Sequence, residues 1–256
     1  MHDYLVFTLA APLASFGTVA VGERRPTWDR PSKSQTLGLI ASALGIERAD
    51  EAAQQALAAS LGFAVRVDDP GQLASDYQTS QAAKEVEIRR RVKAFGPIRT
   101  RAGELACDDL KTILSRREFR TGSLYTIAVW CRGDVVHPLD EIERSLAAPV
   151  FAPFAGRKAF PLMLPMAPRR LQASDLEVAF ARYDAGEPAD VVELKAGLGI
   201  KPQRQRPIFT EAGSVAPDRV WRIEERRDHP ESRSKWRFGL RTEVVLKPSE
   251  PAGSQS

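Results

Sequence analysis

The chain has 256 residues, of which 43% are apolar and 27% are charged. This composition is typical of a globular protein with one large or two small domains, and it excludes fibrous and wholly disordered chains. Lys and Arg outnumber Asp and Glu by 37 to 33, so a polyanionic partner is favoured only if the positive charge is clustered.

The N-terminal region predicts a buried strand rather than a membrane segment. Residues 4–22 carry no charge, but Pro12 and Gly17 interrupt the apolar run and no positive segment precedes it. Residues 4–9 are rich in aromatic and β-branched side chains, which favours a strand. We therefore expect a strand at 4–9, a loop over 10–30 and no membrane insertion.

Two helices and a strand are predicted next. Ser32 or Ser34 can cap a helix whose apolar residues recur at helical spacing from Leu37 to Leu44, and Gly45 fits its C-terminal cap. A second helix is expected from an Asp50 cap to residue 60. Residues 61–67 then predict a strand that ends in a turn at 68–71.

Residues 78–120 have few apolar side chains and no clean periodicity. Within them, residues 84–101 hold seven Lys or Arg against two Glu. Phe95-Gly96-Pro97 is a turn signal. We predict an extended, basic excursion, such as a β-hairpin, that projects from the core.

Regular structure is predicted again after the excursion. Residues 123–130 form the strongest strand pattern in the chain, and residues 139–146 indicate a short helix. A Pro-rich stretch follows, residues 170–200 are ambiguous, and 220–224 and 242–246 predict strands. The tail, 248–256, is expected to be disordered. The order of elements favours an α+β fold with a ferredoxin-like sheet.

Basic clusters are the main functional signal, because the motifs of nucleotide-binding loops, zinc proteases and serine hydrolases are absent. For any one cluster, the alternative to a binding site is a charged surface that is merely solvated. Cys107 and Cys131 are far apart and the histidines are scattered, so we expect no cofactor, metal or disulfide, and a reducing compartment such as the cytoplasm. Aromatic residues near the clusters can either pack in the core or stack on unpaired bases; they are Trp28, Phe95, Trp236 and Phe238.

Several segments resemble the CasD-type subunits of type I-E CRISPR Cascade complexes. The first 46 residues carry the most specific part of the resemblance. The matching segments are YLVFTLAAPLASFG at 4–17, RPT at 25–27, PSKS at 31–34, LGLI at 37–40, ALGI at 43–46, FAGRK at 154–158 before Pro161-Leu162, and RRDHP at 226–230 before Arg233, Phe238 and Arg241.

The resemblance implies a ferredoxin-like, RRM-related domain over 1–148, with a basic hairpin thumb at about 78–120, and a smaller β-rich part over 149–247. It also implies a non-catalytic subunit that binds the 5′ handle of the CRISPR RNA (crRNA) and caps one end of the backbone filament. The protein partners would be the adjacent backbone subunit and the large subunit. The implied RNA-binding residues are Arg25, Lys33, Ser34, Arg89, Arg90, Arg91, Gly156, Arg157, Lys158, Arg226, Arg233 and Arg241.

Two other functions stay open. Relatives in subtype I-C cut repeat RNA with a Tyr, Lys and His set, and metal-free cleavage of that kind needs a base and an acid. Tyr77, His137 and His229 are present, but no adjacent Lys and His are. The second alternative is a protein-only scaffold whose basic surface is merely solvated.

Overall fold

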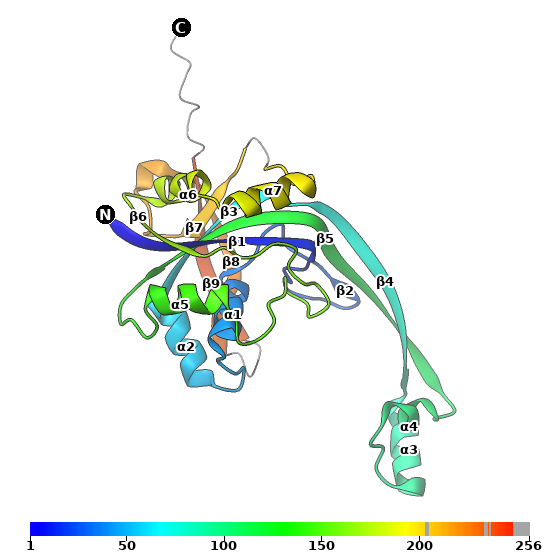
Figure 1. Ribbon diagram of the computed structural model, residues 1–256. Coiled ribbons are helices and arrows are strands. Elements are labelled where there is room, and N and C mark those ends of the chain that lie inside the picture. Colours follow the sequence, from blue (N-terminus) through cyan, green and yellow to red (C-terminus); the bar gives the residue numbers. More distant parts are fainter. Residues whose placement is uncertain (203–204, 233–234, 236, 248–256) are drawn as a thin grey trace.

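Figure 1 presents the computed structural model, which describes residues 1–202, 205–232, 235 and 237–247. The described strands form one nine-stranded sheet in the order β6-β1-β5-β3-β7-β9-β8, and both β2 and β4 also pair with β5. The strands are β1 (His2–Ala14), β2 (Arg24–Arg25), β3 (Leu61–Asp69), β4 (Gln72–Ala83), β5 (Leu110–Cys131), β6 (Arg169–Ala173), β7 (Ile208–Glu211), β8 (Val220–Ser232) and β9 (Arg237–Leu246).

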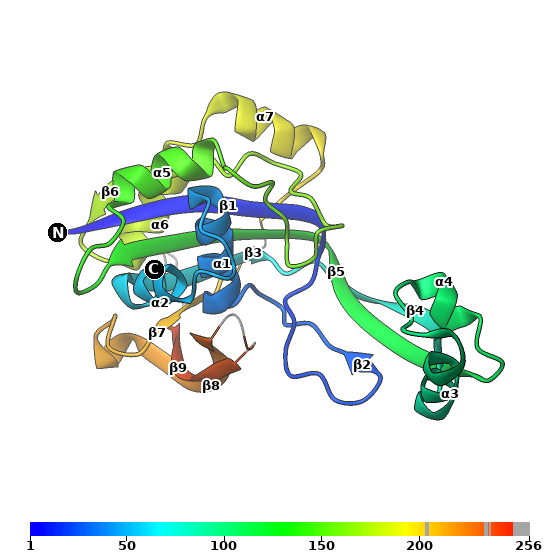
Figure 2. The same cartoon turned by 90° about the horizontal axis from the view of Figure 1, so that it is seen from below.

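Helices cover both faces of the central strands (Figures 1 and 2). Alternate residues of β1 enter different cores, because successive side chains of a strand point to opposite faces. Leu5 and Phe7 pack with α1, α2 and α5, whereas Tyr4 and Val6 pack with α6. The helices are α1 (Lys33–Leu44), α2 (Glu51–Ser60), α3 (Glu85–Phe95), α4 (Arg101–Leu105), α5 (Leu139–Ala147), α6 (Leu176–Ala185) and α7 (Ala189–Gly197), with a 3-10 turn η1 (Pro217–Arg219).

The local signals of the first helices are confirmed. The Ser32 hydroxyl accepts a hydrogen bond from the Gln35 amide at the start of α1, and Gly45 ends the helix in the left-handed conformation. Asp50 caps α2 in the same way through the Ala53 amide. The mixed α and β class is also confirmed. The first strand is longer than expected and continues through residues 10–14, which pair with β5.

The expected excursion projects from the body, but its basic segment is helical rather than extended. Strands β4 and β5 pair without interruption from Gln72 and Thr121 to Ala83 and Leu110. Helices α3 and α4 lie at the far end (Figure 1). We call residues 72–121 the arm. Local helix signals explain the difference, since Glu85 and Glu87 lie in the first turn of α3 and Lys93 in its last.

Strands β8 and β9 form a hairpin that joins the sheet through β7. Both are longer than the predicted strands, and the ambiguous residues 170–200 form β6, α6 and α7. The predicted disordered tail, 248–256, lies outside the described residues. The boundary at residue 148 stays a prediction, because strands from both predicted parts share the one sheet. Within the described residues no helix is long and apolar enough to cross a membrane.

Candidate nucleic-acid interface

A groove of about 1730 Å³ lies beside α1 and extends to the base of the arm. Its walls come from segments that are far apart in the sequence: the loop 15–20, residues 25–36, the loop 151–158 and strands β5, β8 and β9. Figure 2 shows the loop around β2 lying between α1 and the arm. A cavity of this size can accept several nucleotides rather than one small molecule.

Positive charge predominates along the groove. Six cationic side chains line it, against the two acidic residues Glu47 and Asp228. Such a surplus on one concave surface is the electrostatic pattern of a polyanion-binding site. The cations come from five separate segments: Arg25, Arg48, Arg117, Arg157, Lys158 and Arg227.

Glu118 of β5 positions three of the segments that form this groove. Its carboxylate accepts hydrogen bonds from Arg24 Nη2 at 2.9 Å and from the Thr27 amide at 3.3 Å. Its backbone carbonyl accepts from Arg157 Nη2 at 2.9 Å and from the Ser15 hydroxyl at 3.3 Å. The loop 17–27, the loop 151–158 and the end of β1 are therefore fixed to one residue at the base of the arm.

Gly156 lies in the groove wall, but its role differs from the one suggested by the sequence. Its N–H donates to the Phe154 carbonyl at 3.1 Å, so this donor is already used inside the loop. Its φ is 86°, and a Cβ there would lie 1.8 Å from the Ser15 carbonyl oxygen. Glycine is thus required for the close approach of two backbone segments, which holds Arg157 and Lys158 in place.

Three predicted RNA contacts, Lys33, Arg226 and Arg241, lie instead in a buried ionic cluster. Their exposed fractions are 4%, 1% and 9%. Lys33 Nζ lies 2.5 Å from Glu211 Oε1, and Arg241 makes two 2.8 Å hydrogen bonds to the Asp228 carboxylate. A buried charge needs a partner of opposite sign. Lys33 therefore joins α1 to β7, Arg241 joins β9 to β8, and Arg226 joins β8 to Arg30. Because all three are buried, they do not meet ligand from solution.

The carboxylate of Asp228 caps the N-terminus of α1. It accepts from the Lys33 backbone amide at 2.9 Å and also lines the groove. Burial alone raises the pKa of Asp228, but the hydrogen bonds and charge of Arg241 outweigh it and hold the pKa below its ordinary value. A carboxylate thus occupies the position where a helix terminus would otherwise attract phosphate. Ser34 also lines the groove but is itself buried.

The arm carries the remaining predicted contacts away from the groove. Arg89 and Arg90 are exposed on α3 and make ion pairs with Glu85 and Glu87 of the same helix. Arg91 is half-buried and donates to the Ala106 carbonyl at 3.1 Å. Figure 1 shows α3 at the far end of the arm. The structure therefore groups Arg25, Ser34, Gly156, Arg157 and Lys158, but leaves Arg89–Arg91 apart. Arg233 lies outside the described residues.

Aromatic side chains line the groove beside the cations. Five of them contribute to its wall: Phe16, Trp28, Phe151, Phe154 and Phe238. Trp28 is held by its backbone, because its amide donates to the Phe16 carbonyl and its carbonyl accepts from Arg120. Flat rings in a basic groove can stack on unpaired bases. Phe95 lies instead at the end of α3, and Trp236 lies outside the described residues.

Three lining cations, Arg48, Arg117 and Arg227, were not among the site residues predicted from the sequence. Arg227 directly follows the buried Arg226, so the burial pattern of β8 separates the two side chains. The alternation of faces along a strand could have distinguished them, had the strand been predicted at its full length. Arg117 pairs with Arg25 across β2 and β5, a contact that only the fold reveals.

The side chains considered for RNA cleavage lie on separate elements. Tyr77 is on β4 in the arm, His229 is on β8, and His137 precedes α5, where its Nδ1 lies 3.1 Å from Glu141 Oε2. None of the three lines the groove. Across the described residues, no three His, Cys, Asp or Glu side chains form a metal-binding group.

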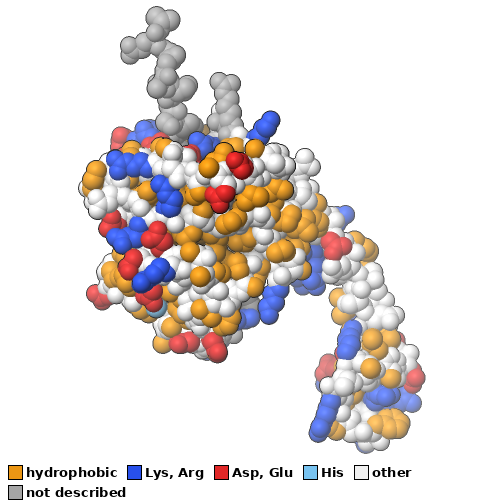
Figure 3. All heavy atoms as spheres, viewed as in Figure 1, with side chains coloured by type: hydrophobic (Ala, Val, Ile, Leu, Met, Phe, Trp, Pro, Cys, Tyr) orange, Lys and Arg blue, Asp and Glu red, His pale blue; other side chains and the backbone are white. Residues whose placement is uncertain are grey.

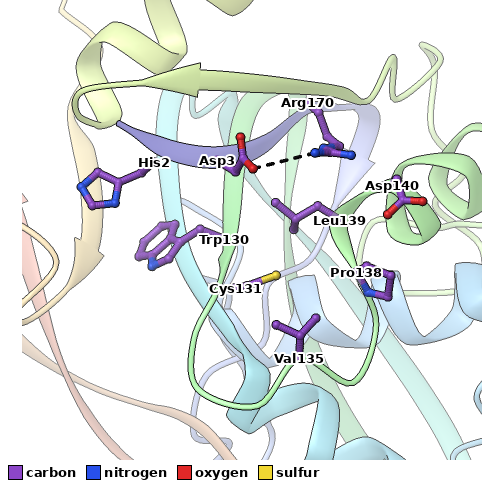
Figure 4. A pocket seen from close by; sticks show the side chains of 9 residues that line it. All are labelled: His2, Asp3, Trp130, Cys131, Val135, Pro138, Leu139, Asp140 and Arg170. Carbon is purple, nitrogen blue, oxygen red and sulfur yellow. Dashed lines mark ion pairs between the residues drawn. The ribbon is translucent and has the colours of Figure 1, made fainter.

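A second cavity of about 310 Å³ lies beside the N-terminal half of β1 (Figure 4). Its charged lining includes Asp3, Asp140 and Arg170, with Arg170 Nη2 3.8 Å from Asp3 Oδ2. Burial and the negative charge of Asp3 raise the pKa of the Cys131 thiol in its wall. The carboxylates make this cavity a poor match for nucleic acid.

Comparisons with known proteins agree on one family. Residues 4–242 match the model of the family described as CRISPR-associated protein (Cas_Cas5). The chain is 31% identical to the CRISPR system Cascade subunit CasD of Escherichia coli (strain K12) over 192 residues, which are 72% of this chain and 78% of the relative.

Solved structures show the same likeness. A chain of a CRISPR RNA-guided surveillance complex matches with a TM-score of 0.63 and 26% identity, covering 96% of this chain and 90% of that chain. A second chain, from a crystal structure of a Cas protein, has a TM-score of 0.53 and 24% identity over 95% of this chain and 94% of that chain, and supports the fold alone.

Proposed function

The chain belongs to the CRISPR-associated Cas5 family, and from that premise we propose that it is an RNA-binding subunit of a Cascade-type CRISPR surveillance complex. Its ligand in this proposal is the 5′ handle of the crRNA. One observation carries the proposal: six cations and five aromatic side chains from distant segments line one groove. Single-stranded RNA combines a dense negative backbone with bases that are free to stack, and this surface suits both.

In the proposed mechanism, the six lining cations neutralise handle phosphates, and the aromatic side chains stack on splayed bases. The cations are Arg25, Arg48, Arg117, Arg157, Lys158 and Arg227. The buried Lys33, Arg226 and Arg241 act indirectly, by fixing the hairpin that carries Arg227. The guide portion of the RNA reads the target by base pairing, so this subunit need only hold the end of the guide. No chemical step is required of it.

The fold supports the same proposal. We interpret the order β6-β1-β5-β3, with α1 and α2 between β1 and β3 and α5 between β5 and β6, as a ferredoxin-like core. We interpret the arm as the thumb, whose cations Arg89, Arg90 and Arg91 would contact RNA or the adjacent backbone subunit. The subunit would cap one end of the filament in the cytoplasm and also meet the large subunit.

The experiment that tests this proposal is a gel-shift of the purified protein with three RNAs, followed by a denaturing gel. The first RNA carries a repeat-derived 5′ handle, the second is a scramble of equal length, and the third is the intact repeat hairpin. We expect the protein to bind the handle in preference to the scramble and to leave all three RNAs intact. Cutting of the hairpin without metal would favour the endoribonuclease instead. No binding of the handle even at low salt would leave a protein-only scaffold, or a subunit whose RNA site forms only inside the assembled complex.

A further inference from the structure

We propose that Val19 is an RNA-contacting wedge, which inserts between two neighbouring bases of the bound handle and keeps them unstacked. This inference deepens the proposed function, because it rests on the groove being the RNA site and names the residue that separates the bases. Val19 lies in the loop 17–22, whose sequence is Gly-Thr-Val-Ala-Val-Gly. We call residues 17–22 the valine loop.

The valine loop offers apolar side chains to the groove and carries no charge of its own. Thr18, Val19 and Ala20 line the groove, and Val19 is 60% exposed. Val21 is 77% exposed but is not among the lining residues. An exposed valine gains free energy when an apolar surface covers it, because apolar area leaves water. On an RNA ligand, the flat apolar surfaces are the faces of its bases.

Both ends of the valine loop are fixed, so its tip is held in place before any ligand binds. Gly17 pairs with Thr27 as an isolated bridge, and the Thr27 hydroxyl accepts from the Phe16 amide at 2.7 Å. At the other end, Arg25 Nη1 donates to the Gly22 carbonyl at 2.6 Å. A valine side chain is also stiff about χ1, because it branches at Cβ. Such a rigid apolar tip loses little conformational entropy on binding, which suits a wedge.

Cations beside the valine loop favour RNA as its occupant. Arg25 lines the groove and pairs in register with Arg117 of β5. Arg157 donates to the backbone carbonyl of Glu118, the next residue of β5. Figure 3, in the view of Figure 1, shows Lys and Arg side chains gathered where the body joins the arm, close to β2. Phosphates bound to these cations place the attached bases beside the uncharged valine loop.

An apolar wedge contributes what the cations cannot. Neighbouring bases of a single strand stack on one another, and an apolar side chain between them replaces this contact on both faces. Bases that are splayed in this way expose the edges by which unpaired RNA is recognised. Trp28 and Phe154 line the same groove and can then stack on the separated bases. The wedge therefore requires a ligand whose bases are unpaired.

The test removes the wedge and measures base unstacking directly. Val19→Ala is compared with Val21→Ala, a matched control because Val21 lies in the same loop but does not line the groove. Val19→Ile, which keeps a branched apolar side chain, is the rescue variant. Each full chain is titrated with handle RNAs in which 2-aminopurine replaces one base at a time, since this base brightens when it loses its stacked neighbours. Melting temperature and the salt dependence of the association constant are measured on the same proteins.

We expect binding of the wild-type chain to brighten 2-aminopurine at two neighbouring positions. Val19→Ala should lose that brightening and about threefold to tenfold of the affinity, because apolar contact area is lost. Its melting temperature and its salt slope should stay unchanged, because no phosphate contact is removed. Val21→Ala and Val19→Ile should behave like the wild type.

Unchanged brightening and affinity in Val19→Ala would overturn the wedge, while the proposed function would stand on handle binding by the wild type. Poorer entry of that variant into the complex would then assign the valine loop to a protein partner. An equal loss in Val21→Ala, or a flatter salt slope in Val19→Ala, would also overturn the wedge. If the wild-type chain binds no handle, alone or in the complex reconstituted with synthetic crRNA, the proposed function fails and the wedge fails with it.

Discussion

Arg226 and Arg227 are adjacent in β8 and have opposite environments. Arg226 is 1% exposed, and its Nη2 donates to the Arg30 carbonyl at 3.0 Å. Its guanidinium carbon also lies 4.9 Å from the centre of the Trp28 ring. Arg227 is exposed, lines the groove and donates to the Phe238 carbonyl at 3.2 Å. One residue therefore supports the wall of the groove from within, and the next faces its ligand.

This pair gives the first prediction. Arg227→Ala should weaken handle-RNA binding about threefold to tenfold, since one phosphate contact is lost, and leave the melting temperature unchanged. Arg226→Ala should instead destabilise the protein by about 2–5 kcal/mol, because a fully buried side chain that packs on Trp28 and donates to the Arg30 carbonyl is removed. Thermal unfolding and fluorescence anisotropy measure the two effects. An Arg226→Ala protein of normal stability would contradict the assignment of this residue to the buried cluster.

Asp228 gives a pH-dependent prediction. Its pKa is lower in the folded chain than in the unfolded chain, so its ionised form favours folding. This contribution is complete above the unfolded pKa of about 4 and is lost as the pH falls through the folded pKa. Asp228→Asn should therefore lower stability at pH 7 and reduce the dependence of stability on pH below 5. Urea unfolding between pH 3 and pH 7 measures both, with exposed Asp134→Asn as the control. Parallel pH profiles for wild type and Asp228→Asn would contradict this account.

Gly156→Ala tests how the loop 151–158 is held. The added Cβ would meet the Ser15 carbonyl, and alanine is strained at a φ of 86°. We expect a loss of stability of about 1–3 kcal/mol together with weaker RNA binding, because Arg157 and Lys158 are displaced. Gly122→Ala is the matched control: its φ is 67°, but a Cβ there meets no atom within 4 Å. Equal effects of the two substitutions would show that backbone strain, and not the contact with Ser15, decides the result.

The end of the arm should be dispensable for folding. Ala83 and Leu110 are paired in the register of β4 and β5, so residues 84–109 can be replaced by Asn-Gly, which favours a two-residue hairpin turn. The shortened chain should keep its melting temperature and its groove but enter the complex poorly. Unfolding of the shortened chain would show that the arm is part of the core, and normal assembly would remove α3 and α4 from the proposed thumb contact.

The sequence predicted those parts of the fold that depend on local signals. Ser32, Gly45 and Asp50 marked helix ends correctly because caps act within four residues. Local signals also account for the wrong prediction at 84–101, where acidic residues at the start of α3 and cations near its end stabilise a helix of low apolar content. The site was only partly predictable, because the groove joins segments more than 100 residues apart.

The site prediction differs most from the structure at three cations that the fold buries. Lys33, Arg226 and Arg241 were included for their charge, but the partners that bury them, Glu211 and Asp228, come from strands whose register the sequence does not reveal. A single step along β8 exchanges a buried arginine for an exposed one. Composition therefore indicated a basic surface correctly, and only the paired strands showed which cations form it.

The salt dependence of RNA binding tests the groove most directly. Six lining cations acting on single-stranded RNA predict a log–log slope of about −4 for the association constant against salt. Lys158→Glu with Arg227→Glu should flatten that slope by at least about 1.4, whereas Arg144→Glu with Arg182→Glu, equal in charge but outside the groove, should leave the slope nearly unchanged. Equal slopes for the two double variants would contradict the assignment of the groove as the RNA site.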